Sequence, residues 1–319
     1  LVQKRRMRRY PYGERNMMNQ VESIYLGFWA AVTGSVCGSF VCCMTERIYD
    51  KRTLGGRSRC PGCGHTLGVM ELIPVFSWLI QKGRCRYCRE RIPPECLWSE
   101  ISLAVFFTAA ALRFDAWNQK ICAAGLGVIL LAIALWDKDT YEIPGSLLAA
   151  ALVWKVIFMM LFPKYGVSVL DGLLGSCLIG GALLLLSVCM DRSMKRETIG
   201  YGDIRLLFVA GFYLGLKGNF LNLFFSSLLG ILMCAAMKTK KIPFGPALAV
   251  STAFCLCYGE ALIRWYVHIW FRLCNVFCIS CSVSISRAEV ESSMTSIGVF
   301  LARALALLLR WPAFGSFRY

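Results

Sequence analysis

Residues 167–190 read VSVLDGLLGSCLIGGALLLLSVCM and carry one charged side chain, Asp171. A helix of about 20 mostly apolar residues can cross the ~30 Å hydrocarbon layer of a membrane. Seven further runs of this kind occur in the chain. Two of them, 98–113 and 204–217, are short; the first holds Glu100 and the second is interrupted by glycines, so both are expected to pack inside a bundle. The sequence therefore predicts an all-α, polytopic membrane helix bundle of about eight transmembrane helices. The other seven runs lie at roughly 24–44, 98–113, 120–136, 145–163, 204–217, 219–237 and 246–271.

The composition excludes most other classes of protein. The residues AVILMFWYC supply 57% of the 319 positions and charged residues only 17%, whereas soluble domains carry about 25% charged residues. The mean hydropathy is +0.57. These values exclude a soluble enzyme, a disordered chain and a fibrous repeat. The net charge is +16, but the basic residues lie mostly in short loops between apolar runs. That distribution fits membrane orientation, and no nucleic-acid partner is expected.

The loops alternate in charge. The polar segment 45–97 contains ten Lys/Arg and five Asp/Glu, and the loops 191–203 and 238–245 are also basic. Because short basic loops stay on the cytosolic side, these loops and 137–144 are predicted to be cytosolic. The expected division of the chain is a basic N-terminal extension at 1–16, a first transmembrane helix at 17–44, a cytosolic four-cysteine zinc loop at 45–97, a membrane core at 98–271 and a C-terminal tail of unknown role at 272–319.

Four of the seventeen cysteines form two C-x-x-C knuckles: Cys60 with Cys63, and Cys85 with Cys88. Two knuckles at this separation are typical of a zinc site, in which four thiolates surround the ion tetrahedrally. Four thiolates leave no open coordination position, so the predicted zinc is structural. Two disulfides are the alternative, which a reducing cytosol disfavours. The other thirteen cysteines are interpreted as small hydrophobic residues.

Two aspartates stand where predicted helices meet the cytosol. Asp137 ends the run 120–136, and Asp203 follows Gly200 and Gly202 at the start of another run. A carboxylate at the edge of the hydrocarbon layer is costly unless it is paired or functional. Two such groups on one side of a bundle suggest a catalytic dyad, and the two glycines would let the backbone and a substrate approach closely. Alternatively, Asp203 is an ordinary helix cap.

Together these residues resemble the prepilin leader peptidase/N-methyltransferase family, which consists of type IV prepilin peptidases of the GxGD membrane aspartyl class. The resemblance covers about 24–260 and rests on motifs that occur in the family's order. They are Gly38-Ser39-Phe40, Arg59-Cys60-Pro61-Gly62-Cys63-Gly64-His65, Glu71-Leu72-Ile73-Pro74, Lys82-Gly83-Arg84-Cys85-Arg86-Tyr87-Cys88, Asp137 seven residues before Pro144, Gly200-Tyr201-Gly202-Asp203, and Ile242-Pro243-Phe244-Gly245-Pro246.

The resemblance implies a bacterial inner-membrane enzyme with its active site on the cytosolic side. It implies that Asp137 and Asp203 are catalytic and that the substrates are precursors of type IV pilins or of pilin-like secretion and competence proteins. Cleavage would follow a glycine just before an apolar helix. The new N-terminus would then be methylated from S-adenosylmethionine, with the polar loop in the methyltransferase half. The implied partners are prepilins and the lipid bilayer.

The chain departs from the family's pattern at several positions. After Gly38-Ser39-Phe40 the family usually has a hydrophobic residue, Asn and Val, whereas this chain has Val41-Cys42-Cys43. Before the acid at Glu100 the family usually has Arg-Tyr-Pro, which is absent here. Two other functions stay open: an ion-coupled transporter that uses the aspartates as proton relays, and a non-enzymatic membrane anchor with a zinc knuckle.

Overall fold

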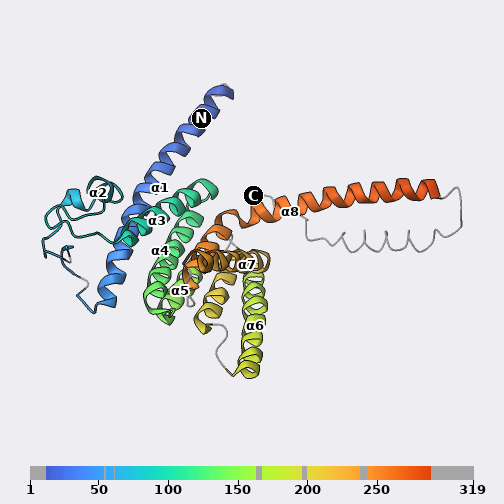
Figure 1. Ribbon diagram of the computed structural model, residues 1–319. Coiled ribbons are helices and arrows are strands. Elements are labelled where there is room, and N and C mark those ends of the chain that lie inside the picture. Colours follow the sequence, from blue (N-terminus) through green and yellow to red (C-terminus); the bar gives the residue numbers. More distant parts are fainter. Residues whose placement is uncertain are drawn as a thin grey trace, which may run out of the picture. The chain divides into compact units, whose positions relative to one another are not determined.

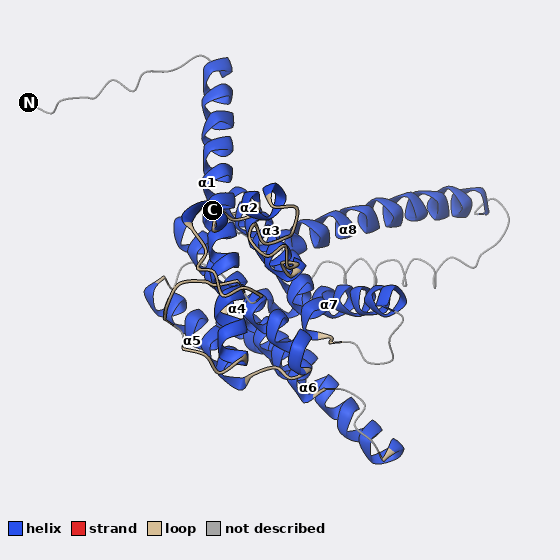
Figure 2. Ribbon diagram, turned by 60° about the vertical axis from the view of Figure 1, so that its left-hand side comes forward, coloured by secondary structure: helices blue, strands red, loops and turns tan. Residues whose placement is uncertain are grey.

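The regular secondary structure of the part of the chain that the computed structural model describes is helical, and the helices are joined by loops (Figures 1 and 2). This part comprises residues 12–53, 55–60, 62–162, 167–195, 200–237 and 243–288, without the side chains of 12–19, 237 and 270–288. The helices are α1 (Tyr12–Tyr49), η1 (Val69–Glu71, a 3-10 turn), α2 (Phe76–Ile80), α3 (Pro94–Arg113), α4 (Trp117–Thr140), α5 (Gly145–Leu161), α6 (Val169–Met194), α7 (Tyr201–Met237) and α8 (Gly245–Ala288).

The predicted class, an all-α polytopic bundle, is confirmed. Six of the described helices are long and apolar enough to cross a membrane, and α5 is a shorter apolar helix. One of the six, α7, is two helices joined at Gly215, whose φ of 70° and ψ of −176° are not helical. When α7 is counted as two, the described residues hold the eight apolar helices that the sequence predicts.

The break in α7 depends on Asp171, the charged residue of the most apolar run. Ser168 caps α6 by accepting a hydrogen bond from the Asp171 N–H, at 3.3 Å. The Asp171 carboxylate in turn accepts from the Leu216 N–H, also at 3.3 Å. A Cβ atom at Gly215 would overlap this carboxylate. The turn between the two halves of α7 therefore needs glycine for both its positive φ and its space.

Some helix ends differ from the prediction. The helix α1 continues to Tyr49, and α3 begins at Pro94, a residue whose fixed φ suits the first position of a helix. Both ends therefore lie inside the segment 45–97 that the sequence assigns to the loop. The helix α8 continues past 271 to Ala288. The chain divides into two compact units, residues 1–261 and 262–319; the predicted extension 1–16 lies largely outside the described residues, as do 289–319 of the predicted tail.

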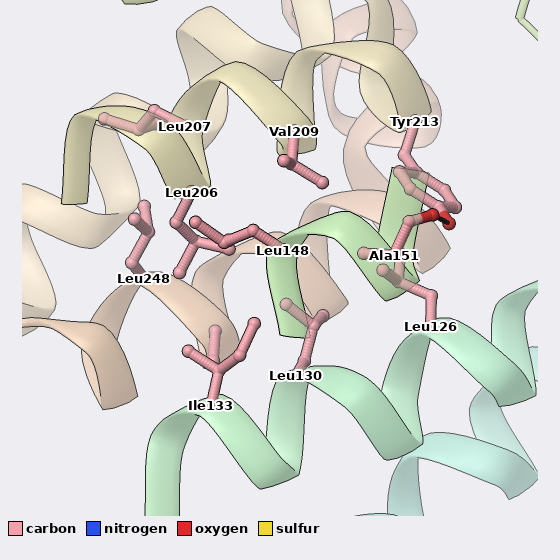
Figure 3. Packing of buried hydrophobic residues seen from close by; sticks show 11 residues of the cluster. Leu126, Leu130, Ile133, Leu148, Ala151, Leu206, Leu207, Val209, Tyr213 and Leu248 are labelled. Carbon is pink, nitrogen blue, oxygen red and sulfur yellow. Dashed lines mark hydrogen bonds between the residues drawn. The ribbon is translucent and has the colours of Figure 1, made fainter. Parts of the chain in front are cut away.

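The polarity of the bundle is that of a membrane protein. Large apolar side chains such as Leu185 and Phe220 are about two-thirds exposed, whereas Asn219, Asn222 and Ser251 are fully buried. Small and polar residues between helices, with apolar ones outside, are typical of helices that pack within lipid. An apolar core also exists, built from α4, α5, α7 and α8 (Figure 3); it comprises Leu126, Leu130, Ile133, Leu148, Ala151, Leu206, Leu207, Val209, Tyr213, Leu248 and Ala249.

The helices α1 and α3 pack with their backbones in contact at two glycines of α1; we call this line of contact the glycine seam. A Cβ at Gly34 would lie 2.5 Å from the Leu103 carbonyl oxygen, and a Cβ at Gly38 would lie 2.5 Å from that of Ser99. Only glycine fits at both places, so the two backbones are in direct contact. At successive contacts the residue number increases along α1, from 34 to 38, and decreases along α3, from 103 to 99, so the two helices are antiparallel. They hold the two ends of the polar loop side by side.

Candidate active site and metal centre

Asp137 lies near the C-terminal end of α4, and the whole residue is only 4% exposed. The helix ends three residues later, where Tyr141 adopts a left-handed conformation and its N–H donates to the Asp137 carbonyl oxygen at 2.8 Å. The Asp137 carboxylate accepts a hydrogen bond from the N–H of Gly245, the first residue of α8, at 2.8 Å. The N-terminal end of a helix dipole favours a negative group at this place.

Asp203 lies in the first turn of α7, as the sequence predicts, and is half-buried. A Cβ at Gly200 would lie 2.9 Å from the Asp203 carboxylate, and one at Gly202 would lie 3.2 Å from the Cβ of Ile143. The first glycine thus leaves space for the carboxylate, and the second lets α7 begin against the segment that follows α4. The start of α7, which carries Asp203, therefore lies beside the end of α4, which carries Asp137.

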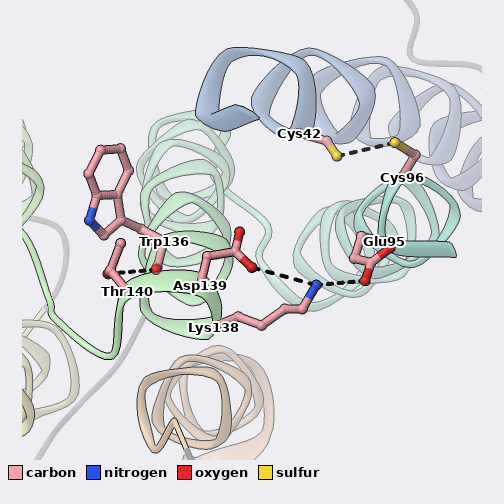
Figure 4. A network of polar contacts seen from close by, with 7 residues as sticks. All are labelled: Cys42, Glu95, Cys96, Trp136, Lys138, Asp139 and Thr140. Atoms are coloured by element: carbon pink, nitrogen blue, oxygen red, sulfur yellow. Dashed lines mark hydrogen bonds and ion pairs between the residues drawn. The ribbon is translucent and has the colours of Figure 1, made fainter. Parts of the chain in front are cut away.

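Several helix ends converge here, on one end of the bundle. Lys138, the residue after Asp137, donates to Glu95 in the first turn of α3 at 2.6 Å (Figure 4). The start of α8 touches Asp137, and the start of α7 touches Ile143. The starts of α3, α7 and α8 therefore lie at the same end of the bundle as the end of α4.

Glu100, which the sequence marks as costly in an apolar helix, is buried in α3 and anchors the polar loop. Its carboxylate accepts the N–H of Val75 at 2.6 Å. Val75 has a φ of 64° and a ψ of −52°, an uncommon conformation for a β-branched residue. The contact fastens the loop segment before α2 to the membrane helix.

The two cysteine knuckles have the same backbone geometry. In each, the backbone N–H of the first cysteine donates to the carbonyl oxygen of the residue five positions later. The carbonyl oxygen of the same cysteine accepts from the backbone N–H of the residue four positions later. These bonds join Cys60 to His65 and Gly64, and Cys85 to Glu90 and Arg89, with lengths of 2.8–3.0 Å. Gly64 and Arg89 both have a positive φ, 68° and 60°. Each turn therefore directs two sulfurs toward the other knuckle.

The four cysteine sulfurs fit a metal ion. All four lie within 4.8 Å of one another, and those of Cys60 and Cys88 are 3.7 Å apart. A tetrahedron with Zn–S bonds of about 2.3 Å has sulfurs about 3.8 Å apart. The ring of His65 packs on Tyr87 at 3.9 Å between centroids, and no described residue other than the four cysteines joins the cluster.

The proton equilibria of these thiols also favour a bound cation. The backbone N–H groups of Cys88 and Tyr87 lower the pKa of Cys85 to about 7. The Glu90 N–H favours the Cys88 thiolate, but desolvation and the neighbouring sulfurs outweigh it and raise the pKa of Cys88 to about 12. Without a cation, Cys88 stays protonated near neutral pH, because the neighbouring sulfurs and desolvation disfavour its thiolate. A divalent soft ion removes this conflict.

Gly245 is the site residue whose role the sequence does not reveal. It stands in the motif Ile242-Pro243-Phe244-Gly245-Pro246, but nothing in the letters connects it with Asp137, 108 positions earlier. The available signal is a glycine between an aromatic residue and proline at a helix start. Such a glycine often marks a close approach of the backbone to another group.

Two family models and several known proteins match the chain. Residues 124–235 match the model of the Type IV leader peptidase family, and residues 32–114 match that of the Bacterial Peptidase A24 N-terminal domain. The chain is similar to the prepilin leader peptidase/N-methyltransferases of Bacillus subtilis (32% identity, 75% of this chain and 96% of that protein) and Aeromonas hydrophila (32%, 66% and 74%). It is similarly related to that of Pseudomonas putida (29%, 64% and 73%). No solved structure matches the chain.

Proposed function

Because this chain belongs to the type IV leader peptidase family, we propose that it removes the leader peptide of prepilins or pilin-like precursors with Asp137 and Asp203 as its catalytic dyad. The observation that supports this most is the position of the Asp137 carboxylate. It lies in the last turn of α4 and is fixed by the first N–H of α8, and α7, whose first turn carries Asp203, begins against the segment that follows α4. Three helix ends thus meet at this place.

The dyad would act on a water molecule between the two carboxyl groups. Two close carboxylates repel each other, so the pair shares one proton. The ionised carboxylate takes a proton from the water, whose oxygen attacks the scissile carbonyl carbon, while the protonated carboxyl donates to the carbonyl oxygen. Collapse of the tetrahedral intermediate breaks the C–N bond, and a dyad proton passes to the leaving amine.

The substrate would reach this site from the membrane. Its apolar helix would lie against the bundle, and its basic leader would stay at the anionic cytosolic surface of the bacterial inner membrane. Cleavage after a glycine next to that helix then falls where α4 ends. The basic loops support a cytosolic site. On this scheme 98–271 is the peptidase core, 17–44 the first membrane helix and 45–97 the loop of the methyltransferase half.

The loop would be held by zinc bound to Cys60, Cys63, Cys85 and Cys88, as a structural ion. The relatives are named N-methyltransferases as well as peptidases; on this scheme the new N-terminus is methylated after cleavage, with S-adenosylmethionine as the expected donor. The described part of the loop contains no glycine-rich turn at the start of a helix of eight residues or more. We therefore assign no residue to the methyl donor and derive no step through it.

Co-expression with a prepilin tests the dyad. Asp137→Asn and Asp203→Asn should each abolish leader cleavage, with the protein still inserted in the membrane, because an amide cannot exchange the proton. Asp139→Asn is the matched control: Asp139 is exposed at the same end of α4 and should be dispensable. Mass analysis of the prepilin N-terminus reports cleavage and methylation together. Normal cleavage by either dyad variant would refute the proposal.

A further inference from the structure

Two cysteines outside the zinc cluster lie in contact. Cys42, near the C-terminal end of α1, and Cys96, in the first turn of α3, have their sulfurs 3.4 Å apart (Figure 4). Both stand where the chain departs from the sequence pattern of its family. The interpretation of these cysteines as isolated small hydrophobic residues is therefore incomplete, because the structure pairs them.

The pair continues the glycine seam between α1 and α3. Gly34, Gly38 and Cys42 are spaced by four residues and so lie on one face of α1. Gly34 touches Leu103, and Gly38 touches Ser99. Cys96 is the next position along α3 in the same direction. The backbone contact at Gly38, one turn away, holds the two helices close enough for the two sulfurs to lie 3.4 Å apart.

The surroundings favour a two-thiol site over a second metal site. Within the described residues, no group of three His, Cys, Asp or Glu side chains includes Cys42 or Cys96 at metal-binding distance. The adjacent Cys43 points elsewhere, with its sulfur 3.9 Å from the hydroxyl of Ser58. Cys42 is buried and Cys96 is half-buried, so a small reagent meets Cys96 first.

We propose that Cys42 and Cys96 form a dithiol that a hydroperoxide oxidises to an intramolecular disulfide. One sulfur of the pair, as its thiolate, attacks the terminal oxygen of the hydroperoxide and becomes a sulfenic acid, and the other peroxide oxygen leaves as hydroxide, or as alkoxide from an organic hydroperoxide, and takes up a proton. The second sulfur then attacks the first and displaces the hydroxyl group as water. Two electrons and two protons pass from the thiols to the peroxide. The sulfurs must approach by about 1.3 Å to reach the bond length of about 2.05 Å.

The disulfide would link α1 to the first turn of α3, and this turn contacts the end of α4 that carries Asp137. Glu95, next to Cys96, accepts the hydrogen bond from Lys138, next to Asp137. The same turn also receives the polar loop. An oxidised pair therefore fixes the junction between the loop and the membrane helices, and a thiol reductant reverses the link by exchange.

The experiment uses the full chain, purified with its metal in detergent and treated with limiting hydrogen peroxide. Remaining thiols are blocked with N-ethylmaleimide, and the digest is analysed by mass spectrometry without reduction. We expect a peptide that links Cys42 to Cys96 to appear before any link at the exposed Cys177, Cys189 or Cys234, and to disappear after dithiothreitol. Cys43→Ser, the matched control, should retain the link.

Three outcomes would overturn the proposal. They are the absence of the Cys42–Cys96 peptide when peroxide has consumed other thiols, a link between chains in its place, and equal linking of Cys42 to Cys37 or Cys43. Cys96→Ser should leave Cys42 alkylated by maleimide after peroxide treatment. Because the wild-type digest alone decides the question, the result does not depend on how well a variant folds, nor on enzymatic activity.

Discussion

Gly245 offers a direct test of how the backbone positions the dyad. A methyl group added by Gly245→Ala would lie 2.6 Å from Oδ2, 2.8 Å from Cγ and 2.9 Å from Cβ of Asp137. Ordinary contacts begin at 3.4 Å, so the carboxylate must move by about 0.8 Å. Because even the Asp137 Cβ is too close, rotation of the carboxylate alone cannot relieve the overlap. The hydrogen bond from the residue 245 N–H would be lost or lengthened.

A displacement near 1 Å in a catalytic group lowers the rate by about 10²-fold, which corresponds to about 2.7 kcal/mol in activation free energy. We expect Gly245→Ala to lower kcat for leader cleavage by about this factor, with KM nearly unchanged, since the overlap acts on the catalytic carboxylate. The assay is steady-state cleavage of a purified prepilin in detergent. It is read by gel mobility or mass analysis.

Gly145→Ala is the matched control for this variant. Gly145 begins α5 as Gly245 begins α8, but a Cβ there has nothing within 4 Å. The control should keep the wild-type kcat, and both variants should elute as the wild-type protein does. A Gly245→Ala enzyme with the kcat of the Gly145→Ala enzyme would refute the inferred role of the α8 N-terminus at Asp137.

The remaining predictions concern the loop and the bundle. A Cys60→Ser, Cys85→Ser double variant should lose its bound zinc, measured by elemental analysis, and retained zinc would contradict a four-sulfur site. Acidification should release zinc from the wild-type protein, because protons compete for the thiolates, and a chromogenic chelator follows the release. Gly215→Ala should destabilise the protein by about 1–3 kcal/mol from its positive φ, with a further cost from the overlap with Asp171, seen as a lower Tm in detergent. Asn222→Leu should cost about 1–3 kcal/mol by the same measurement, because it removes the hydrogen bonds of Asn222 with Asn219 and Thr252.

The sequence predicts those parts of the fold whose causes are local. Apolar length alone locates the membrane helices, and the glycines near 215 indicate the break in α7, because hydropathy and backbone freedom act within about twenty residues. The spacing of Cys60, Cys63, Cys85 and Cys88 predicts their convergence for the same reason. The short turn of a C-x-x-C knuckle fixes the direction of both sulfurs.

Contacts between distant segments could not be predicted in this way. The bond from Gly245 to Asp137 and the contact of Cys42 with Cys96 depend on how helices pack, which no local pattern encodes. The glycines at 34 and 38 are a partial signal, since their spacing indicates a close helix neighbour without identifying α3. The full lengths of α1, α3 and α8 could not be predicted, because hydropathy reports the apolar part of a helix and not where the helix itself begins or ends.

The two knuckles share one turn geometry but differ in the residue at its left-handed position, and this difference affects the stability of each turn. The left-handed position is occupied by glycine in the first knuckle, at Gly64, and by arginine in the second, at Arg89. An L-residue with a side chain pays roughly 1 kcal/mol to stay in that region, whereas glycine does not. The interaction that holds the four sulfurs together must also hold Arg89 in its left-handed conformation. When the metal is removed, the turn 85–89 should unfold before the turn 60–64, and Arg89→Gly should make the two turns equally stable.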